Sequence, residues 1–234
     1  MSIADKVARI RDRIATAAVR AGRDASQITL MAVSKTFPAD PIREAHAAGI
    51  RVFGENRVQE FAGKAGALCN LAGARWHMIG HLQNNKASKA AELFHAVDSV
   101  DSLRLAEKLS DAATAAGKQL EVLLEINVGG EAAKSGMAPD SQEVDLVLEA
   151  APRLPNLRIR GLMTLPPFTE DPQAARPYFR RLREIHDKIR GRRLPAVEMD
   201  VLSMGMSHDF EVAIEEGSTC VRVGTAIFGW RTRA

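Results

Sequence analysis

The sequence has few cysteines, few aromatic residues and no long hydrophobic run. Cys69 and Cys220 are the only cysteines among 234 residues, which makes neither a disulfide framework nor a zinc site. No stretch is apolar over the roughly 20 residues that a membrane helix needs. The charged N-terminal segment also lacks the apolar core of a secretion signal. We therefore expect a cytoplasmic protein with no membrane partner and no bound metal.

An excess of charge of one sign is also lacking. The chain has 32 basic and 29 acidic residues, so its net charge is only +3. Nucleic-acid binding needs a clustered basic face, and this balance gives no support for one. Hydrophobic residues make up 46% and charged residues 26% of the chain, which is typical of a folded globular protein.

Apolar runs alternate with helical segments along the whole chain. A first amphipathic helix over about 24 residues is indicated by Ile3, Val7, Ile10, Ile14 and Ala17, which share one face at three- and four-residue spacing. Short apolar runs follow at 28–34, 50–56, 75–82, 95–100, 120–128, 157–165, 198–205 and 219–224. Continuously apolar strands are typical of a parallel sheet that is covered by helices on its outside.

Eight such strand–helix units in a chain of this length predict a closed barrel. We expect an α/β protein, a single (β/α)8 TIM barrel with an extra N-terminal helix, formed by one domain over residues 1–234. An open doubly wound sheet is the alternative. It is disfavoured because "VSKTFP" follows the first strand where a glycine-rich dinucleotide turn would stand.

Lys35 follows the first apolar run, in "MAVSKTFP". Strand side chains alternate, so Lys35 shares a face with Met31 and Val33. If that face lines the barrel, the amine is partly desolvated, and the neutral form that attacks a carbonyl becomes more accessible. This predicts a Schiff-base lysine. The other interpretation is a lysine that reaches solvent at the rim and pairs with a carboxylate.

The segments after the seventh and eighth runs, "LSMGMSHD" and "VRVGTAIFG", are rich in small residues and hydroxyls. Loops in these positions are the frequent phosphate site of barrels. Small residues let backbone N–H groups approach an anion, and Ser203, Ser207 and Thr225 add hydroxyl donors beside Gly224. The other interpretation is that the glycines only turn the chain.

Arg222 lies within an otherwise apolar strand, "CVRVG". A buried guanidinium is very unfavourable without an acceptor, so Arg222 should face one in the cavity, and Glu125 on the fifth strand is a candidate partner. A Schiff-base lysine, a phosphate cup and a cationic donor together describe a site for pyridoxal 5'-phosphate, which offers an aldehyde, a phosphate and a ring nitrogen.

At this point the sequence resembles the pyridoxal phosphate homeostasis protein family, whose fold is that of the barrel domain of alanine racemase. The resemblance rests on "AVSKT", "FGENRVQE", "WHMIGHLQNNK", "KSGM", "RGLMTL", "LSMGMSHD" and "VRVGTAIFG", and covers about residues 28–229. It implies Schiff-base formation at Lys35, a place beside the ring for Asn56 and a contact with the ring nitrogen for Arg222. It further implies that Ser207, Gly224 and Thr225 hold the phosphate, with Ser203 close by.

The sequence departs from the family pattern at Phe37. Many members have a second lysine there, so any role of that amine in passing the cofactor on is in doubt for this chain. Lys134 in "KSGM" matches another family lysine and remains a candidate acceptor.

The resemblance implies a carrier or supplier of the cofactor in vitamin B6 homeostasis, with apo-forms of pyridoxal phosphate enzymes as possible partners and a monomeric or weakly dimeric state. A racemase needs a second acid/base opposite the lysine, which in the resembling racemase is a tyrosine from a C-terminal β domain. We expect no such domain here and place Tyr178 outside the barrel mouth. The alternatives are a minimal racemase that uses Lys35 with His81 or water, and a sugar-phosphate enzyme with Lys35 as an aldolase-type lysine.

Overall fold

A computed structural model describes residues 1–131 and 134–229 of the chain. The first element is the expected amphipathic helix, α1 (Ile3–Arg20). Ser2 caps it in a reciprocal capping box with Asp5, which satisfies two of the free N–H groups at the helix start. The predicted stripe is confirmed, because Val7, Ile10 and Ile14 are all buried.

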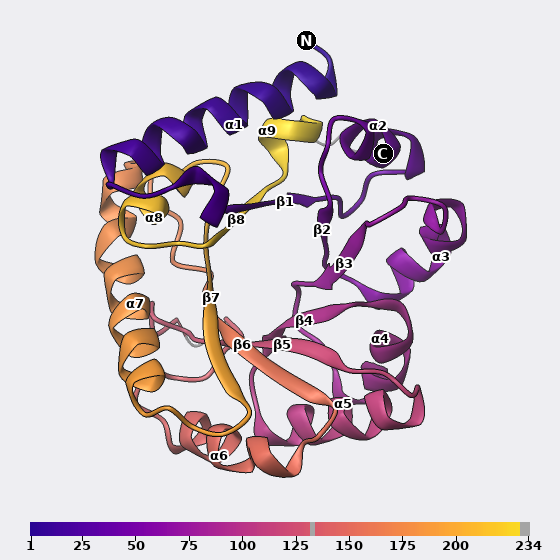
Figure 1. Ribbon diagram of the computed structural model, residues 1–234, viewed down its shortest axis with the longest axis vertical. Coiled ribbons are helices and arrows are strands. Elements are labelled where there is room, and N and C mark those ends of the chain that lie inside the picture. The colour runs from indigo at the N-terminus through magenta and orange to yellow at the C-terminus, as the bar shows by residue number, and fades with distance from the viewer. Residues whose placement is uncertain (132–133, 230–234) are drawn as a thin grey trace.

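The strands form a closed parallel barrel in the order β1-β2-β3-β4-β5-β6-β7-β8, which confirms the predicted fold class. Every strand pairs with its sequence neighbour, and β8 returns to pair with β1 through Ala32 and Val223. Figure 1 shows the strands surrounded by helices. The strand bounds are β1 Thr29–Val33, β2 Val52–Glu55, β3 Arg75–Met78, β4 Ala96–Val100, β5 Leu120–Glu125, β6 Leu157–Met163, β7 Val197–Met206 and β8 Cys220–Val223.

Helices follow the strands around the outside of the barrel (Figure 1). Several begin at the cap residues that helices favour, as α5 does at Ser102, whose hydroxyl accepts from the backbone N–H of Leu105. The helices after α1 are α2 Ala39–Ala47, α3 Val58–Leu68, α4 Ala87–Leu93, α5 Leu103–Ala115, α6 Gln142–Ala150, α7 Arg176–Gly191, α8 Phe210–Glu215 and α9 Thr225–Phe228. Short 3-10 turns lie at Ala25–Gln27, Asn84–Lys86, Ala151–Arg153 and Pro172–Ala175. None of the helices in the described ranges is long and apolar enough to cross a membrane.

Most of the buried hydrophobic residues fall into two clusters. The larger cluster lies between strands and helices and includes Ala32 of β1. The smaller one comprises Met31, Val33, Ile79 and Cys220. Residues 31 and 33 of β1 therefore lie on the face opposite to residue 32, as strand alternation requires. Met31 and Val33 therefore share one face of β1, as expected. Lys35 lies in the turn beyond the strand, so its place on that face stays a prediction.

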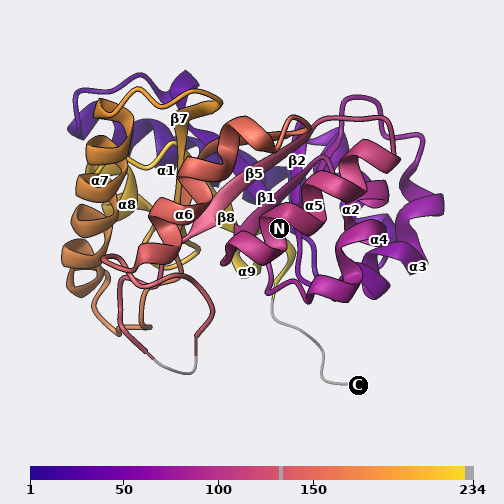
Figure 2. The same ribbon diagram turned by 90° about the horizontal axis from the view of Figure 1, so that it is seen from below.

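A network of ion pairs lies toward the N-terminal ends of β5, β6 and β7. Arg160 on β6 contacts Glu121 at 3.0 Å and Glu198 at 3.1 Å, and it also pairs with Asp200. The hydrogen bonds to Asp200 are the main reason that the pKa of Arg160 is raised. The opposite end carries the loops. In Figure 2 the described parts of the loop between β5 and α6 lie on the same side of the molecule as the short helix α9.

Candidate functional site

Lys35 lies in the turn that follows β1, with a partly buried side chain. Thr36, the next residue, has a φ of +68°, which is unusual for a β-branched residue and is maintained only by surrounding contacts. One such contact is the hydrogen bond that the Thr36 backbone N–H donates to the Glu60 carboxylate of α3. Another is the bond from the Phe37 N–H to the Ser34 carbonyl at 3.2 Å. The lysine is therefore presented on a fixed turn.

A buried ion pair between Glu55 of β2 and Lys64 of α3 contacts this turn and stabilises it. The Lys64 amine donates to the Ser34 carbonyl at 3.1 Å and to the Phe37 carbonyl at 3.2 Å. It also pairs at 2.9 Å with Glu55, whose side chain is fully buried and accepts a bond from the Ser34 hydroxyl at 2.5 Å. Burial raises the pKa of Glu55, while Lys64 opposes the shift. The sequence interpretation missed Lys64; the only local signal was its i,i+4 spacing from Glu60.

Asn56 follows β2 directly, beside the Lys35 turn, and its side chain is partly buried. Its backbone packs against Gly80 after β3. A Cβ at Gly80 would lie 2.5 Å from the Asn56 carbonyl oxygen, so no larger residue fits there without a shift. Asn56 is thus held at the barrel mouth by close backbone packing.

Arg222 of β8 is only 2% exposed. Its guanidinium donates to the Ser203 hydroxyl at 2.6 Å and to the Thr164 carbonyl at 2.7 Å. Burial lowers the pKa of Arg222. The candidate partner Glu125 makes no hydrogen bond or ion pair with it among the described residues. Ser203 is itself fully buried, so its hydroxyl orients the arginine.

Ser207, Gly224 and Thr225 meet on the β8 side of the mouth. The Gly224 N–H donates to the Ser207 hydroxyl at 3.2 Å, and Thr225 is exposed at the start of α9. Gly224 lies against β1, because a Cβ there would be 3.4 Å from the Val33 Cβ. The three residues therefore lie next to the strand that presents Lys35.

Phe37, the residue at which a departure from the family pattern was expected, stacks on Phe228 of α9. Their ring centroids are 4.9 Å apart. Offset aromatic pairs of this kind add stability beyond the area that they bury. The substitution therefore joins the Lys35 turn to the helix that begins at Thr225.

The other candidate residues are distributed over and beyond the mouth. His81 is exposed and its Nδ1 lies 3.1 Å from Asp101, whereas His77 lies deeper and contacts Asp98 at 3.0 Å. Lys134 pairs with Glu131 and donates to the Pro166 carbonyl at 3.1 Å. Tyr178 lies on α7, in the outer layer of helices. No cluster of three or more His, Cys, Asp or Glu suited to a metal occurs in the described part of the chain.

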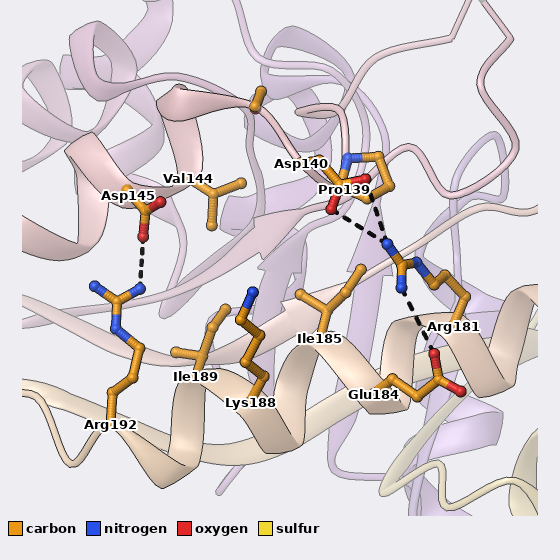
Figure 3. Close-up of a pocket in the computed structure, with 11 residues that line it drawn as sticks. Pro139, Asp140, Val144, Asp145, Arg181, Glu184, Ile185, Lys188, Ile189 and Arg192 are labelled. Carbon is orange, nitrogen blue, oxygen red and sulfur yellow. Dashed lines mark hydrogen bonds and ion pairs between the residues drawn. The ribbon is translucent and has the colours of Figure 1, made fainter.

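A hollow of about 400 Å³ lies between α6 and α7, outside the barrel (Figure 3). Ile185, Ile189 and Val144 form its apolar floor, and ion pairs from Arg181 to Asp140 and from Arg192 to Asp145 border it. It belongs to the outer layer of helices and is separate from the residues predicted for the cofactor.

The donor set at the mouth fits pyridoxal 5'-phosphate. A guanidinium has five N–H donors, and described residues satisfy two of those of Arg222, which leaves buried donors for an acceptor such as a ring nitrogen. Lys35 supplies an amine suited to an aldehyde. Ser207, Gly224 and Thr225 supply hydroxyl and N–H donors of the kind that bind phosphate.

The closed barrel with this set of residues defines a protein of the alanine racemase barrel class. In agreement, the family model "Alanine racemase, N-terminal domain" matches residues 6–232. An alanine racemase of Clostridium difficile has the same fold, with a TM-score of 0.71 at 14% identity over 96% of this chain and 57% of the racemase.

Relatives with higher sequence identity define a narrower family within this class. The pyridoxal phosphate homeostasis protein of Pseudomonas aeruginosa is 48% identical over 98% of this chain and 96% of its own length. The structure of PipY of Synechococcus elongatus with pyridoxal phosphate bound has a TM-score of 0.81 at 36% identity, over 97% of this chain and 100% of PipY. The chain belongs to the pyridoxal phosphate homeostasis protein family.

Proposed function

We propose that the protein binds pyridoxal 5'-phosphate as a Schiff base on Lys35 and serves in intracellular vitamin B6 homeostasis as a carrier or supplier of the cofactor. The observation that carries this proposal is the fixed turn of Lys35 beside Gly224 and Thr225, in a chain 48% identical to a pyridoxal phosphate homeostasis protein. PipY, which is 36% identical, has pyridoxal phosphate bound, and this supports the same ligand here.

Each site residue has one role in this proposal. Ser207, Gly224 and Thr225 hold the phosphate, Asn56 lies beside the ring and Arg222 donates to the ring nitrogen. Ser203 acts on the ligand through Arg222, to which its hydroxyl is bonded at 2.6 Å. The Lys64–Glu55 cluster positions the turn that carries Lys35.

We propose that the protein has no strong catalytic activity. Bound pyridoxal phosphate supplies an aldehyde and an electron-withdrawing ring. Arg222 opposes protonation of the ring nitrogen by charge repulsion, which weakens electron withdrawal. The names of the relatives, which describe homeostasis proteins, support this part of the proposal.

We further propose that residues 1–234 act as one cofactor-binding domain in the cytoplasm, as a monomer or weak homodimer, and that apo-forms of pyridoxal phosphate enzymes receive the cofactor. Two unpaired cysteines, an exposed Cys69 and a buried Cys220, are consistent with a reducing compartment.

The proposal is tested by loading the purified protein with pyridoxal phosphate and recording its absorbance before and after borohydride reduction. We expect an imine band, and after reduction a mass increase of one cofactor on the peptide that contains Lys35. Lys35→Ala should lose both signals, while Lys89→Ala, which changes an exposed lysine of α4, should keep them. An unchanged band in Lys35→Ala, or trapping that occurs only with sugar phosphates, would contradict the assignment.

The oriented His81, whose Nδ1 lies 3.1 Å from Asp101, makes a weak racemase the second candidate. This function predicts that solvent deuterium enters the Cα position of an added amino acid and that chirality is lost. Exchange no faster than with free cofactor would eliminate it, and exchange that His81→Ala abolishes would support it.

A further inference from the structure

Glu125 is a buried carboxylate that the proposed cofactor site does not use. It ends β5 and is only 3% exposed. Its Oε1 accepts a hydrogen bond from the Ser135 hydroxyl at 3.0 Å, whereas its Oε2 is buried without a hydrogen-bond partner among the described residues. Burying an acceptor of this kind without a partner is unfavourable, so its retention in a well-packed barrel calls for a ligand that supplies the missing donor.

The "KSGM" segment of the sequence is built around this carboxylate. Besides the bond from Ser135, the Met137 N–H donates to the Glu125 carbonyl at 2.8 Å. Gly136 has a φ of +107°, and a Cβ there would lie 3.2 Å from the Glu125 Cγ, so glycine allows the loop to fold closely over it. The loop thus fixes Glu125 through three consecutive residues.

A pocket of about 520 Å³ opens above Glu125 and is lined by His81, Lys134, Ser135 and Leu165. It lies among the loops that follow β3, β5 and β6, whereas Lys35 and Gly224 follow β1 and β8. In a closed barrel of eight strands, β5 stands opposite β1. The pocket therefore lies across the barrel mouth from Lys35 and Gly224.

The charged groups around the pocket indicate which ligand charges would be favourable at its floor and at its rim. Asp101, Arg222 and His81 are near enough to Glu125 to influence its pKa, and Lys134 pairs with Glu131. A cationic donor satisfies Oε2, whereas an anionic group at that depth would be repelled. At the rim, by contrast, the exposed His81 and the third N–H donor of Lys134, beyond those to Glu131 and Pro166, suit a carboxylate.

We propose that this pocket binds a small α-amino acid, with its ammonium group on Glu125 and its carboxylate toward His81 and Lys134. The site is separate from the proposed Lys35 site and exists whether or not Lys35 carries cofactor. If the proposed function holds as well, the pocket places an amine across the mouth from the cofactor.

Binding should depend on pH in a defined direction. Burial raises the pKa of Glu125 and Asp101 adds to the shift, while Ser135, Arg222 and His81 oppose it. An ammonium group prefers the ionised carboxylate, so affinity should increase as pH rises through the pKa of Glu125. At a pH below that value, binding should release a proton, which calorimetry in buffers of different ionisation enthalpy detects.

The test is calorimetric titration with glycine, and with acetate as the matched probe that lacks the ammonium group. It uses the wild-type protein, loaded and unloaded with cofactor, and Lys35→Ala. We expect saturable glycine binding to all three, weaker binding of acetate, and an affinity reduced about tenfold or more in Glu125→Gln. Glu107→Gln, which changes an exposed carboxylate of α5, should bind as the wild type does.

Ser135→Ala provides a second variant that leaves the carboxylate in place. It should weaken glycine binding severalfold. Thermal unfolding of both variants is the control that they are folded. Glycine binding that Glu125→Gln leaves unchanged would overturn the proposal, as would equal binding of acetate. Binding seen only with the loaded wild-type protein and lost in Lys35→Ala would also overturn it, because glycine would then be reacting with the cofactor. Failure of Lys35 to carry cofactor would leave glycine binding intact.

Discussion

At the scale of single residues, the contact between Lys64 and Glu55 decides where Lys35 lies. The Lys64 amine, with a side chain that is 11% exposed, holds two carbonyls of the Lys35 turn and the buried Glu55 carboxylate. In the proposed site Lys35 supplies the reactive amine, and Lys64 holds the turn that carries it.

We expect Lys64→Met to lower the free energy of unfolding by about 3–5 kcal/mol, because it leaves the Glu55 charge buried without compensation. Urea unfolding measures the change. It should be accompanied by weaker cofactor binding, since the Lys35 turn loses two hydrogen bonds. Lys89→Met, on the exposed face of α4, is the control and should change stability by less than about 0.5 kcal/mol. A similarly small effect in Lys64→Met would show that the cluster does not hold the turn.

At the scale of elements, the unit formed by β7, the loop after it and α8 depends on one glycine near the end of β7. Gly205 has a φ of +91°, and a Cβ there would lie 2.5 Å from the Ala213 Cβ and 2.9 Å from the Phe210 Cα. The backbone must take this conformation so that Ser207 turns back toward Gly224. The glycine therefore couples the packing of α8 to the proposed phosphate site.

We expect Gly205→Ala to destabilise the protein by about 2–3 kcal/mol, from backbone strain and overpacking together, and to weaken binding of the cofactor phosphate. Gly66→Ala is the matched change, because Gly66 lies within α3 with open space around its Cα. It should stabilise the protein by about 0.5–1 kcal/mol and leave the imine band unchanged. Equal behaviour of the two variants in thermal unfolding and cofactor titration would refute this account.

At the scale of the whole molecule, the two ends of the barrel differ: one has ion pairs that stabilise the fold, and the other has the candidate binding residues. The N-terminal end holds the ion pairs of Arg160, and the C-terminal end holds Lys35, Arg222 and the Glu125 pocket. Conserving stability at one end and placing chemistry at the other is the usual arrangement of such barrels.

We expect Arg160→Met to lower stability by about 1–2 kcal/mol at neutral pH, with the imine band retained. The hydrogen bond from Arg160 lowers the pKa of Asp200 below the ordinary value of an aspartate. A lowered carboxyl pKa stabilises the folded state above that value and loses its effect as pH falls through the folded pKa. The difference between wild type and variant should therefore shrink below about pH 4. A constant difference in urea unfolding between pH 3 and 7 would contradict this explanation.

The sequence by itself determined the eight strands, the amphipathic first helix and the shared face of Met31 and Val33 on β1. These follow from local periodicity: the apolar runs predict buried strands, and alternation places Met31 and Val33 together. The burial of Arg222 could also be predicted, because the residues before and after it in its strand are apolar.

Only the tertiary structure decided which groups meet. Closure of the barrel brings β8 beside β1, so Phe37 stacks on Phe228 and Gly224 lies against Val33. In the closed barrel Arg222 donates hydrogen bonds to Ser203 and Thr164 and not to Glu125. Glu125 instead accepts a hydrogen bond from Ser135 of the "KSGM" segment. Periodicity describes one element at a time, whereas these contacts join residues that are distant in the chain. Their geometry is set by strand pairing and packing, which no local pattern contains.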